Sequence, residues 1–469
     1  MPTTQETNLD KRIKRQIIGK PQDFLVYTPM GFEQTFVREI AAFGIGVKNE
    51  DNQEQNAFTV TEGKVYFTDK LSNALKVLAY SRIAGRFLMK VESFKATNFN
   101  QLEKNLEQIP WELYIGSAGH IFKNDRAENL ICKPLKISVT CKRSRLYHSD
   151  AVKEIFEKVL GNKNSTETLV VDFEDDRCTI GLDLSDAEMY KRGFERFVER
   201  APLKEHLAFA ALYEAGISTA SAIIDPMAGS GTFSLEAYMY GAGLVPGKMR
   251  HFDYEKAPFF KKAAWDYLVS HADPPRNGEP ANANPNKSLE IYASDILPKA
   301  VETIRHNFNA LANAAQPKNI LYKAVLDPIG VSPLQGDSKI VLSKAISIQG
   351  DRLITAPLTS NKSCYNHAAP QPCIALTDFF NLDFSKIPDN SILALNPPYG
   401  IRLKVDEVAL YKRIGEKLNR ELGALPSKNL SLVIFVPSKE CLEALNIRYD
   451  KKIRTNHGGI NLDVVFKQW

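Results

Sequence analysis

The sequence predicts an α/β protein in which two small α/β units precede a larger domain built on a mostly parallel sheet. Strand-like and helix-like segments alternate through about the last 280 residues, which is typical of a doubly wound parallel sheet. The chain has 469 residues, enough for two to four domains at about 100–200 residues each. Hydrophobic residues make up 44% and charged residues 25%, a balance that indicates a soluble globular protein and excludes a mostly disordered chain.

The first unit follows a basic N-terminal stretch. Residues 1–20 lack the apolar core of a signal peptide, and we predict a flexible tail there. Clusters of β-branched and aromatic residues then predict strands, and apolar residues at helical spacing predict helices. In order, these patterns give a strand at Asp23–Pro29, a helix at Glu33–Phe43, a hairpin of Phe58–Thr61 and Lys64–Thr68, and a helix at Ser72–Arg86. This order predicts a small α/β sandwich over residues 21–93.

The second unit is predicted over residues 94–188. Its elements are helices at Asn100–Ile109 and Asp150–Leu160 and strands at Pro134–Thr140, Leu169–Phe173 and Cys178–Asp183. One stretch holds five basic residues and no acidic one: Lys133, Lys136, Lys142, Arg143 and Arg145. Such a stretch is typical either of a solvated strand end or of a surface that contacts nucleic-acid phosphates.

The large domain is predicted over residues 189–469. Its strands are Ala222–Asp225, Leu289–Ser294, Ile374–Thr377, Ile392–Leu395 and Leu430–Val436, with helices at Phe233–Tyr240 and Leu297–Leu311. Two proline-punctuated segments do not follow the alternation, about residues 271–287 and 317–372. Loops of that length are uncommon inside compact domains, so we interpret both as surface insertions.

A glycine-rich turn follows the first strand of this domain. Asp225-Pro-Met-Ala-Gly-Ser-Gly-Thr232 leads from a strand into a helix, where open α/β sheets bind ligands. The turn could also be purely structural. A dinucleotide site is disfavoured, because the third glycine of G-x-G-x-x-G is replaced by Ser234 and Asp295 lies much farther on than the usual spacing of about 20 residues.

The sequence Asn396-Pro-Pro-Tyr-Gly400 directly follows another strand of the same sheet. An exocyclic amino group on a base is a poor nucleophile, because its lone pair is delocalised into the ring. The Asn396 carboxamide and a neighbouring backbone carbonyl can accept its hydrogens and return electron density to nitrogen. Consecutive prolines fix the direction of that carbonyl, and Tyr399 offers a face on which a flipped-out base can stack. This arrangement predicts methylation of a base amino group.

Several motifs occur in an order that is highly specific as a set. They are Pro29-Met-Gly-Phe-Glu33, Cys141-Lys-Arg-Ser-Arg-Leu-Tyr-His148, Arg192-Gly-Phe194, Ala201-Pro-Leu-Lys-Glu205, Asn396-Pro-Pro-Tyr-Gly-Ile-Arg-Leu403 and Asn456-His-Gly-Gly-Ile460. In these motifs the chain resembles the THUMP-domain RNA methyltransferases of the class I S-adenosylmethionine-dependent type. It is most similar to the bacterial enzymes that make N2-methylguanosine in 23S ribosomal RNA. The resemblance covers the chain from about Asp23 to Trp469.

The resemblance implies a ferredoxin-like domain and a THUMP RNA-binding domain, followed by a Rossmann-like class I methyltransferase domain. It implies S-adenosylmethionine as cofactor, bound by Pro202, Asp225, Pro226, Met227, Ala228, Gly229, Ser230, Gly231, Thr232, Phe233, Asp295, Ile296, Asp378, Phe379 and Asn396. Asp295 would bind the ribose hydroxyls, and Asp378 with Phe379 the adenine. The target guanine would be held by Asn396, Pro397, Pro398 and Tyr399. The RNA would contact Lys133, Lys136, Lys142, Arg143, Arg145 and Arg402.

Alternative substrates remain open at this stage. The same motif serves adenine N6 methylation in DNA or RNA, and THUMP domains commonly hold transfer RNA. A third possibility is an RNA-binding factor with an inactive catalytic domain. We expect a cytoplasmic protein, because no signal peptide or membrane span is predicted, and we expect a monomer. Only one modification should be made, because the chain ends without the second methyltransferase domain fused to some relatives. Six cysteines without a CxxC pair, and no uninterrupted apolar run of about 18 residues, predict no metal site, disulfide or membrane span.

Overall fold

A computed structural model describes most of the chain, which forms two compact units. The described residues are 7–46, 58–116, 135–161, 167–186, 188–198, 202–270, 289–315, 346–348, 353–355, 372–399, 406–423 and 429–469. The first unit comprises Met1–Pro29, Phe36–Arg192 and Val245–Pro274, and the second comprises Met30–Thr35, Gly193–Leu244 and Pro275–Trp469.

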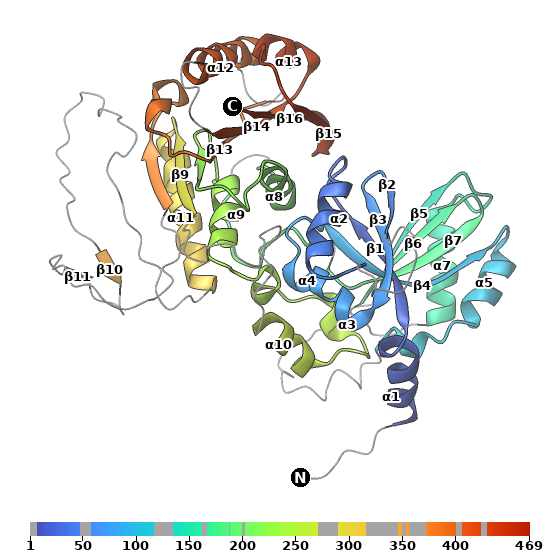
Figure 1. The fold of residues 1–469 in the computed structure, drawn as a ribbon. Coiled ribbons are helices and arrows are strands. Elements are labelled where there is room, and N and C mark those ends of the chain that lie inside the picture. The colour runs from blue at the N-terminus through green and yellow to red at the C-terminus, as the bar shows by residue number, and fades with distance from the viewer. Residues whose placement is uncertain are drawn as a thin grey trace, which may run out of the picture. The chain divides into compact units, whose positions relative to one another are not determined.

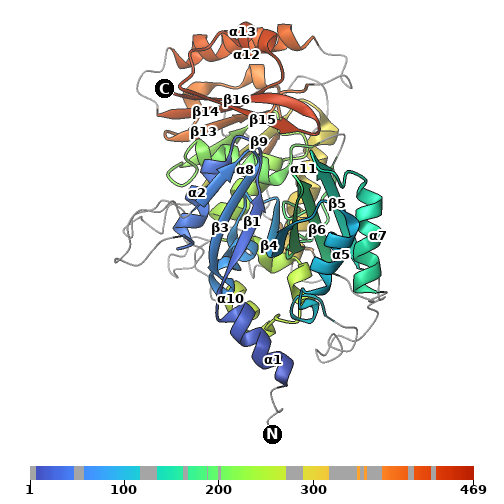
Figure 2. The same cartoon turned by 90° about the vertical axis from the view of Figure 1, so that its right-hand side faces the viewer.

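The first unit is organised around one seven-stranded sheet (Figure 2). Its strand order is β2 (Phe58–Thr61), β3 (Lys64–Lys70), β1 (Pro21–Tyr27), β4 (Arg86–Lys95), β7 (Arg177–Asp183), β6 (Thr168–Glu174) and β5 (Lys136–Lys142). Only β5 and β6 pair in parallel among these neighbours. Strands of both predicted small domains therefore join a single sheet, and the predicted boundary at residue 93 falls inside β4.

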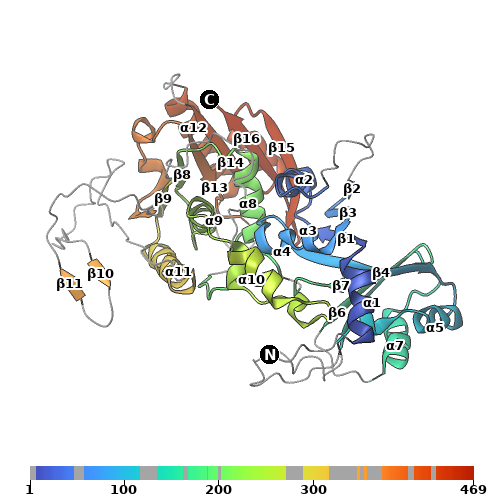
Figure 3. The same ribbon diagram turned by 60° about the horizontal axis from the view of Figure 1, so that its bottom comes forward.

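The helices of this unit mostly match the sequence patterns. They are α2 (Glu33–Ala42), α3 (Leu71–Ala74), α4 (Lys76–Tyr80), α5 (Phe99–Glu107) and α7 (Ser149–Leu160). Helix α5 lies beside α7 (Figure 3), and α7 packs against β5. The helix predicted at Ser72–Arg86 is wrong beyond Tyr80. There the Glu39 carboxylate accepts hydrogen bonds from the Arg82 N–H (2.8 Å) and the Ser81 hydroxyl (2.5 Å). These bonds turn the chain into β4.

The prediction of a flexible tail is wrong for residues 8–18. They form α1 (Asn8–Ile13) and a π-helical segment, η1 (Lys14–Ile18), and Thr7 caps the first helix by accepting a hydrogen bond from the Asp10 N–H. Ile13 and Ile17 are buried, while the basic residues between them face outward. An amphipathic face thus anchors this segment, and the local excess of basic residues concealed that pattern.

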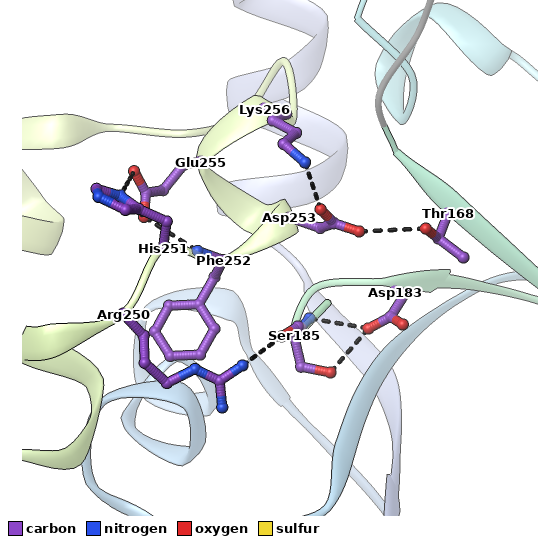
Figure 4. Close-up of polar contacts among 9 residues, drawn as sticks. All are labelled: Thr168, Asp183, Ser185, Arg250, His251, Phe252, Asp253, Glu255 and Lys256. Carbon is purple, nitrogen blue, oxygen red and sulfur yellow. Dashed lines mark hydrogen bonds and ion pairs between the residues drawn. The ribbon is translucent and has the colours of Figure 1, made fainter. Parts of the chain in front are cut away.

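Residues 245–274 also belong to the first unit, although the sequence predicted them inside the large domain. They contain η3 (Pro246–Met249), η4 (Asp253–Lys256) and α10 (Lys262–Ser270). Figure 4 shows the polar contacts that hold them. The Asp253 carboxylate accepts from the Thr168 hydroxyl of β6 (3.2 Å) and pairs with Lys256 (2.6 Å), while Arg250 donates to the Ser185 carbonyl (3.2 Å).

The second unit has a seven-stranded, mostly parallel sheet, as predicted. Its order is β12 (Pro372–Leu376), β9 (Glu290–Asp295), β8 (Ala222–Asp225), β13 (Ser391–Leu395), β14 (Leu430–Val436), β16 (Ile460–Gln468) and β15 (Lys451–His457). The first five strands are parallel, and β16 runs antiparallel to both of its neighbours. The chain moves outward from β8 to β9 and β12, then returns to β13 on the other side of β8. This reversal is the switch point at which such sheets bind ligands.

Helices cover both faces of this sheet (Figure 1). On one face lie α12 (Glu407–Leu422) and α13 (Lys439–Leu445), and on the other lie α8 (Glu205–Glu214), α9 (Thr232–Gly241) and α11 (Pro298–Ala315). Apolar side chains of β8, β13 and β14 pack with α12 and α13 in one core. Of the predicted insertion at 317–372, the structure describes the short ribbon β10 (Ile346–Ile348) and β11 (Leu353–Thr355) and the start of β12. The insertion at 271–287 lies outside the described residues.

Candidate cofactor and substrate site

The predicted site residues of the second unit gather at one edge of its sheet. Asp225 ends β8, Asp295 ends β9, Asp378 lies two residues beyond β12, and Asn396 directly follows β13. These four strands are parallel neighbours, so their carboxyl ends meet at the same edge. Asp225 and Asn396 flank the switch point between β8 and β13.

The glycine-rich turn is held close to β9 by Asp295. One carboxylate oxygen of Asp295 accepts a hydrogen bond from the Gly229 N–H (2.9 Å), and the other accepts from the Leu297 N–H (2.9 Å). Gly229 and Gly231 have φ angles of +56° and +80°, which side chains with a Cβ rarely adopt. A Cβ on Gly229 would meet open space, whereas one on Gly231 would lie 3.3 Å from Ile304. The turn therefore has an open side at Gly229.

Asp225 is a buried carboxyl group with one unsatisfied oxygen. Its Oδ2 accepts from the Ser234 hydroxyl (2.7 Å) and the Ser234 N–H (3.2 Å), while Oδ1 is buried without a hydrogen-bond partner in the described structure. Burial raises the pKa of Asp225 to about 7, against the two bonds from Ser234, and the charge of Asp295 raises it further. An unsatisfied buried acceptor of this kind suits a cationic hydrogen-bond donor.

Two residues that the sequence did not single out brace the turn. The Arg196 guanidinium pairs with Glu205 (2.8 Å) and donates to the hydroxyls of Ser230 (2.7 Å) and Thr232. The fully buried Asn307 of α11 donates to the Ser230 carbonyl (2.9 Å) and also bonds the backbone of Phe197. Neither lies in a local motif, so the sequence alone carried no signal for these contacts.

The residues after β13 differ in exposure. Pro397 is buried, Pro398 is exposed, and the carboxamide oxygen of Asn396 is buried without a hydrogen-bond partner in the described structure. The Tyr399 hydroxyl lies 3.4 Å from Nδ1 of His457, at the end of β15. Burial raises the pKa of Tyr399 to about 12 and lowers the pKa of His457, so a neutral phenol meets a neutral imidazole ring in this contact. His457 lies in one of the sequence motifs, but the sequence did not reveal its contact with Tyr399.

The remaining predicted cofactor residues have mixed surroundings. Asp378 caps the short helix η5 (Phe379–Asn381) by accepting from the Phe380 N–H (3.0 Å), and Ile296 is 61% exposed. Phe379 is only 2% exposed and packs beside Phe384 in the core, so its ring contributes to the packing beneath the Asp378 turn. Pro226, Ala228 and Phe233 are buried, and Pro202 is half-buried.

The predicted RNA-binding residues that the structure describes belong to the first unit. Lys136, Lys142, Arg143 and Arg145 are all exposed. Arg143 pairs with Glu174 (2.5 Å) and Asp175 (3.0 Å), and Arg145 with Asp176 (3.6 Å). RNA phosphates would therefore compete with an acidic turn for these guanidinium groups. Lys133 and Arg402 lie outside the described residues, and RNA contact by this set stays a prediction.

The described ranges contain neither a metal-binding cluster nor a membrane-spanning helix. No group of three or more His, Cys, Asp or Glu residues there could hold a metal ion. No helix in the described part of the chain is both long and apolar enough to cross a membrane.

Comparison with known proteins identifies the fold of the second unit. Residues 192–324 match a family profile described as "RMKL-like, methyltransferase domain". A chain described as "SMU.472, a putative methyltransferase complexed with SAH" superposes with a TM-score of 0.66 at 19% identity, covering 96% of this chain and 98% of that one. The second unit has a class I methyltransferase fold. A chain from Listeria monocytogenes described as a "predicted N6-adenine-specific DNA methylase" also has a TM-score of 0.66, at 20% identity, covering 96% of this chain and 97% of that one.

Curated sequences give a related result. The ribosomal RNA large subunit methyltransferase K/L of Syntrophotalea carbinolica is 24% identical over 94% of this chain and 52% of its own length. That of Psychromonas ingrahamii is 28% identical over 93% of this chain and 49% of its own length. The chain thus spans about half the length of the curated relatives it matches. These matches confirm the predicted resemblance to methyltransferases of large-subunit ribosomal RNA.

Proposed function

We propose that the chain is an S-adenosylmethionine-dependent methyltransferase that modifies the N2 amino group of a guanosine in 23S ribosomal RNA. The observation that carries the proposal is the placement of Asn396-Pro-Pro-Tyr399 beside the glycine-rich turn. Both follow adjacent parallel strands, β13 and β8, at the switch point of the sheet. Similarity to large-subunit methyltransferases K/L supports ribosomal RNA as the substrate.

The residues present fit the cofactor. The unsatisfied Oδ1 of Asp225 can accept from an ammonium group, and the open side of Gly229 allows a ligand to approach the backbone closely. Asp295 is oriented at the end of β9, where its carboxylate has remaining lone pairs for ribose hydroxyls. S-adenosylmethionine supplies an electrophilic methyl group at this edge of the sheet.

The protein's part in the reaction is to position the base and accept its hydrogens. The carboxamide oxygen of Asn396 is unsatisfied and can accept one N–H of the guanine amino group. A neighbouring backbone carbonyl, directed by two prolines, can accept the other. No strong base is required, because the nitrogen becomes acidic once it carries the methyl group. Preorganised acceptors and orientation then account for the rate.

Cofactor binding should depend on pH through Asp225. In the free protein the raised pKa, about 7, keeps this carboxyl largely protonated near pH 6. An ammonium group favours the ionised form, so binding releases a proton, and affinity should rise by up to about ten-fold per pH unit below the pKa. Calorimetry at pH 5.5–8, in buffers of different ionisation enthalpy, measures both effects. Asp225→Asn should abolish the pH dependence. A flat wild-type profile would contradict this role of Asp225.

RNA binding should depend on three exposed basic residues of the first unit. Replacing Lys142, Arg143 and Arg145 by Ala should weaken RNA binding and flatten its salt dependence, because phosphate contacts release counterions. Cofactor affinity should not change. Binding to a ribosomal RNA fragment over a range of salt concentrations tests this expectation. An unchanged slope of log affinity against log salt would mean that these residues only face solvent.

Incubation with labelled methyl donor and total RNA, followed by nucleoside mass spectrometry, tests the proposed function. The expected product is N2-methylguanosine in large-subunit RNA. Label in transfer RNA would favour the transfer-RNA alternative. N6-methyladenine, in RNA or in DNA supplied in parallel, would favour the adenine chemistry suggested by the Listeria neighbour's description. Absence of any methylated nucleoside, with bound cofactor, would favour a noncatalytic RNA-binding protein.

A further inference from the structure

Arg196 is a buried charged side chain behind the start of α9. Its side chain is only 7% exposed, yet it lies in the segment before α8 that carries no glycine-rich or Asn-Pro-Pro-Tyr motif. Its two terminal nitrogens contact Glu205, Ser230 and Thr232. Its Nε is buried without a hydrogen-bond partner in the described structure. A buried guanidinium with an unsatisfied donor is costly, and such groups need an explanation.

The contacts of Arg196 prepare Ser230 to bind an anion. The Ser230 oxygen accepts a hydrogen bond from the guanidinium, so its own hydrogen is directed elsewhere and can be donated. Ser230 stands just before α9, whose first residue is Thr232, and the N-terminus of a helix favours negative charge. Glu205 balances part of the guanidinium's charge. The N-terminus of the ten-residue helix and the hydroxyl orientation fixed by Arg196 therefore favour an anion at this turn.

The surroundings of the turn contain carboxylates as well. Asp225 and Asp295 lie at the adjacent strand ends, and Glu205 pairs with Arg196. This set attracts a cationic group but repels a carboxylate. A ligand that carries both charges on one carbon, as an α-amino acid does, needs a local cation for its anionic end. Arg196 supplies that cation, while the unsatisfied oxygen of Asp225 is available to the ammonium end.

We propose that Arg196 is a positioning residue that, through Ser230, makes the turn select ligands with an amino-acid carboxylate. This inference rests on the proposed function, because the ligand in question is the methionine part of the cofactor. The proposal assigns the two ends of the ligand to different residues of one site. Arg196 and Ser230 govern affinity for the amino-acid end, and the strand-end carboxylate of Asp295 governs affinity for the adenosine end.

The test compares two ligands that differ only in that end. S-adenosylhomocysteine and 5′-methylthioadenosine share the adenosine and a neutral thioether, but only the first carries the amino acid. Calorimetry with Arg196→Gln should show a loss of about 10- to 100-fold for S-adenosylhomocysteine, the scale of one charge-assisted hydrogen bond. Affinity for 5′-methylthioadenosine should change less than about three-fold. Arg196→Lys keeps the positive charge and should restore part of the difference. Ser230→Ala should reproduce the pattern of Arg196→Gln at least as strongly, because Arg196 acts through Ser230.

Arg420→Gln is the matched control, because Arg420 is an exposed arginine on α12 whose guanidinium pairs with Glu421. It should leave both affinities unchanged. Thermal unfolding of each variant shows whether the protein remains folded. If folded Arg196→Gln loses affinity for both ligands equally, Arg196 merely braces the turn and the proposal is wrong. It is also wrong if neither affinity changes. Failure of the unaltered protein to bind S-adenosylhomocysteine at all would instead overturn the proposed function.

Discussion

Replacing Asn396 by Ala is expected to lower single-turnover methylation by about 10²–10³-fold, the scale seen when one preorganised transition-state hydrogen bond is lost. The structure supports this expectation, because the carboxamide oxygen is buried and unsatisfied immediately after β13. In the proposed reaction, this oxygen gains its partner when the base amino group arrives. Affinity for the cofactor should change far less, since the contacts of the glycine-rich turn do not involve Asn396.

Single-turnover methylation of a ribosomal RNA fragment, with cofactor affinity measured separately, checks the Asn396 variant. Asn419→Ala is a suitable control, because Asn419 is an exposed asparagine on α12 whose amide bonds the Asn446 carbonyl. Near-normal turnover by Asn396→Ala would show that the active site lies elsewhere. A proportionate loss of cofactor affinity would mean that Asn396 shapes the cofactor pocket rather than the reaction.

The buried parallel strands were predictable because each is a short apolar run that ends at a polar or glycine-rich segment. The structure places β8 at Ala222–Asp225 and β14 at Leu430–Val436, with the predicted bounds. Strand ends carry the site in such sheets, so Asp225, Asp295 and Asn396 could be grouped before any coordinates existed. Grouping these three residues required only the strand ends and no knowledge of side-chain contacts.

Other features depend on tertiary contacts that leave no local pattern. Seven consecutive residues of α8 are buried, so this helix lacks the alternation of apolar and polar faces by which helices are recognised. Arg196 meets Thr232, and Asn307 meets Phe197, across long stretches of sequence. The helix predicted at Ser72–Arg86 ends early because the Arg82 N–H bonds Glu39, which belongs to a different helix.

The contact between Tyr399 and His457 predicts that different substitutions of Tyr399, the proposed base-stacking residue, lower methylation to different extents. Burial is the main cause that lowers the pKa of His457, and the charge of Lys204 adds to it, while a backbone hydrogen bond with Pro202 opposes it. A neutral ring can accept the phenol hydrogen at Nδ1. At 3.4 Å this bond is long, so its contribution is small. The ring face of Tyr399 should therefore matter more than its hydroxyl group.

Tyr399→Ala should lose stacking worth about 1–3 kcal/mol and lower methylation accordingly, whereas Tyr399→Phe should cost less than about five-fold. His457→Phe should match Tyr399→Phe, and the double variant should be no worse than either single one, because both remove the same bond. Single-turnover rates on one RNA fragment measure all four variants. If Tyr399→Phe proves as damaging as Tyr399→Ala, the hydroxyl rather than the ring acts on the base. If the two Phe variants add, His457 contributes through contacts other than the phenol of Tyr399.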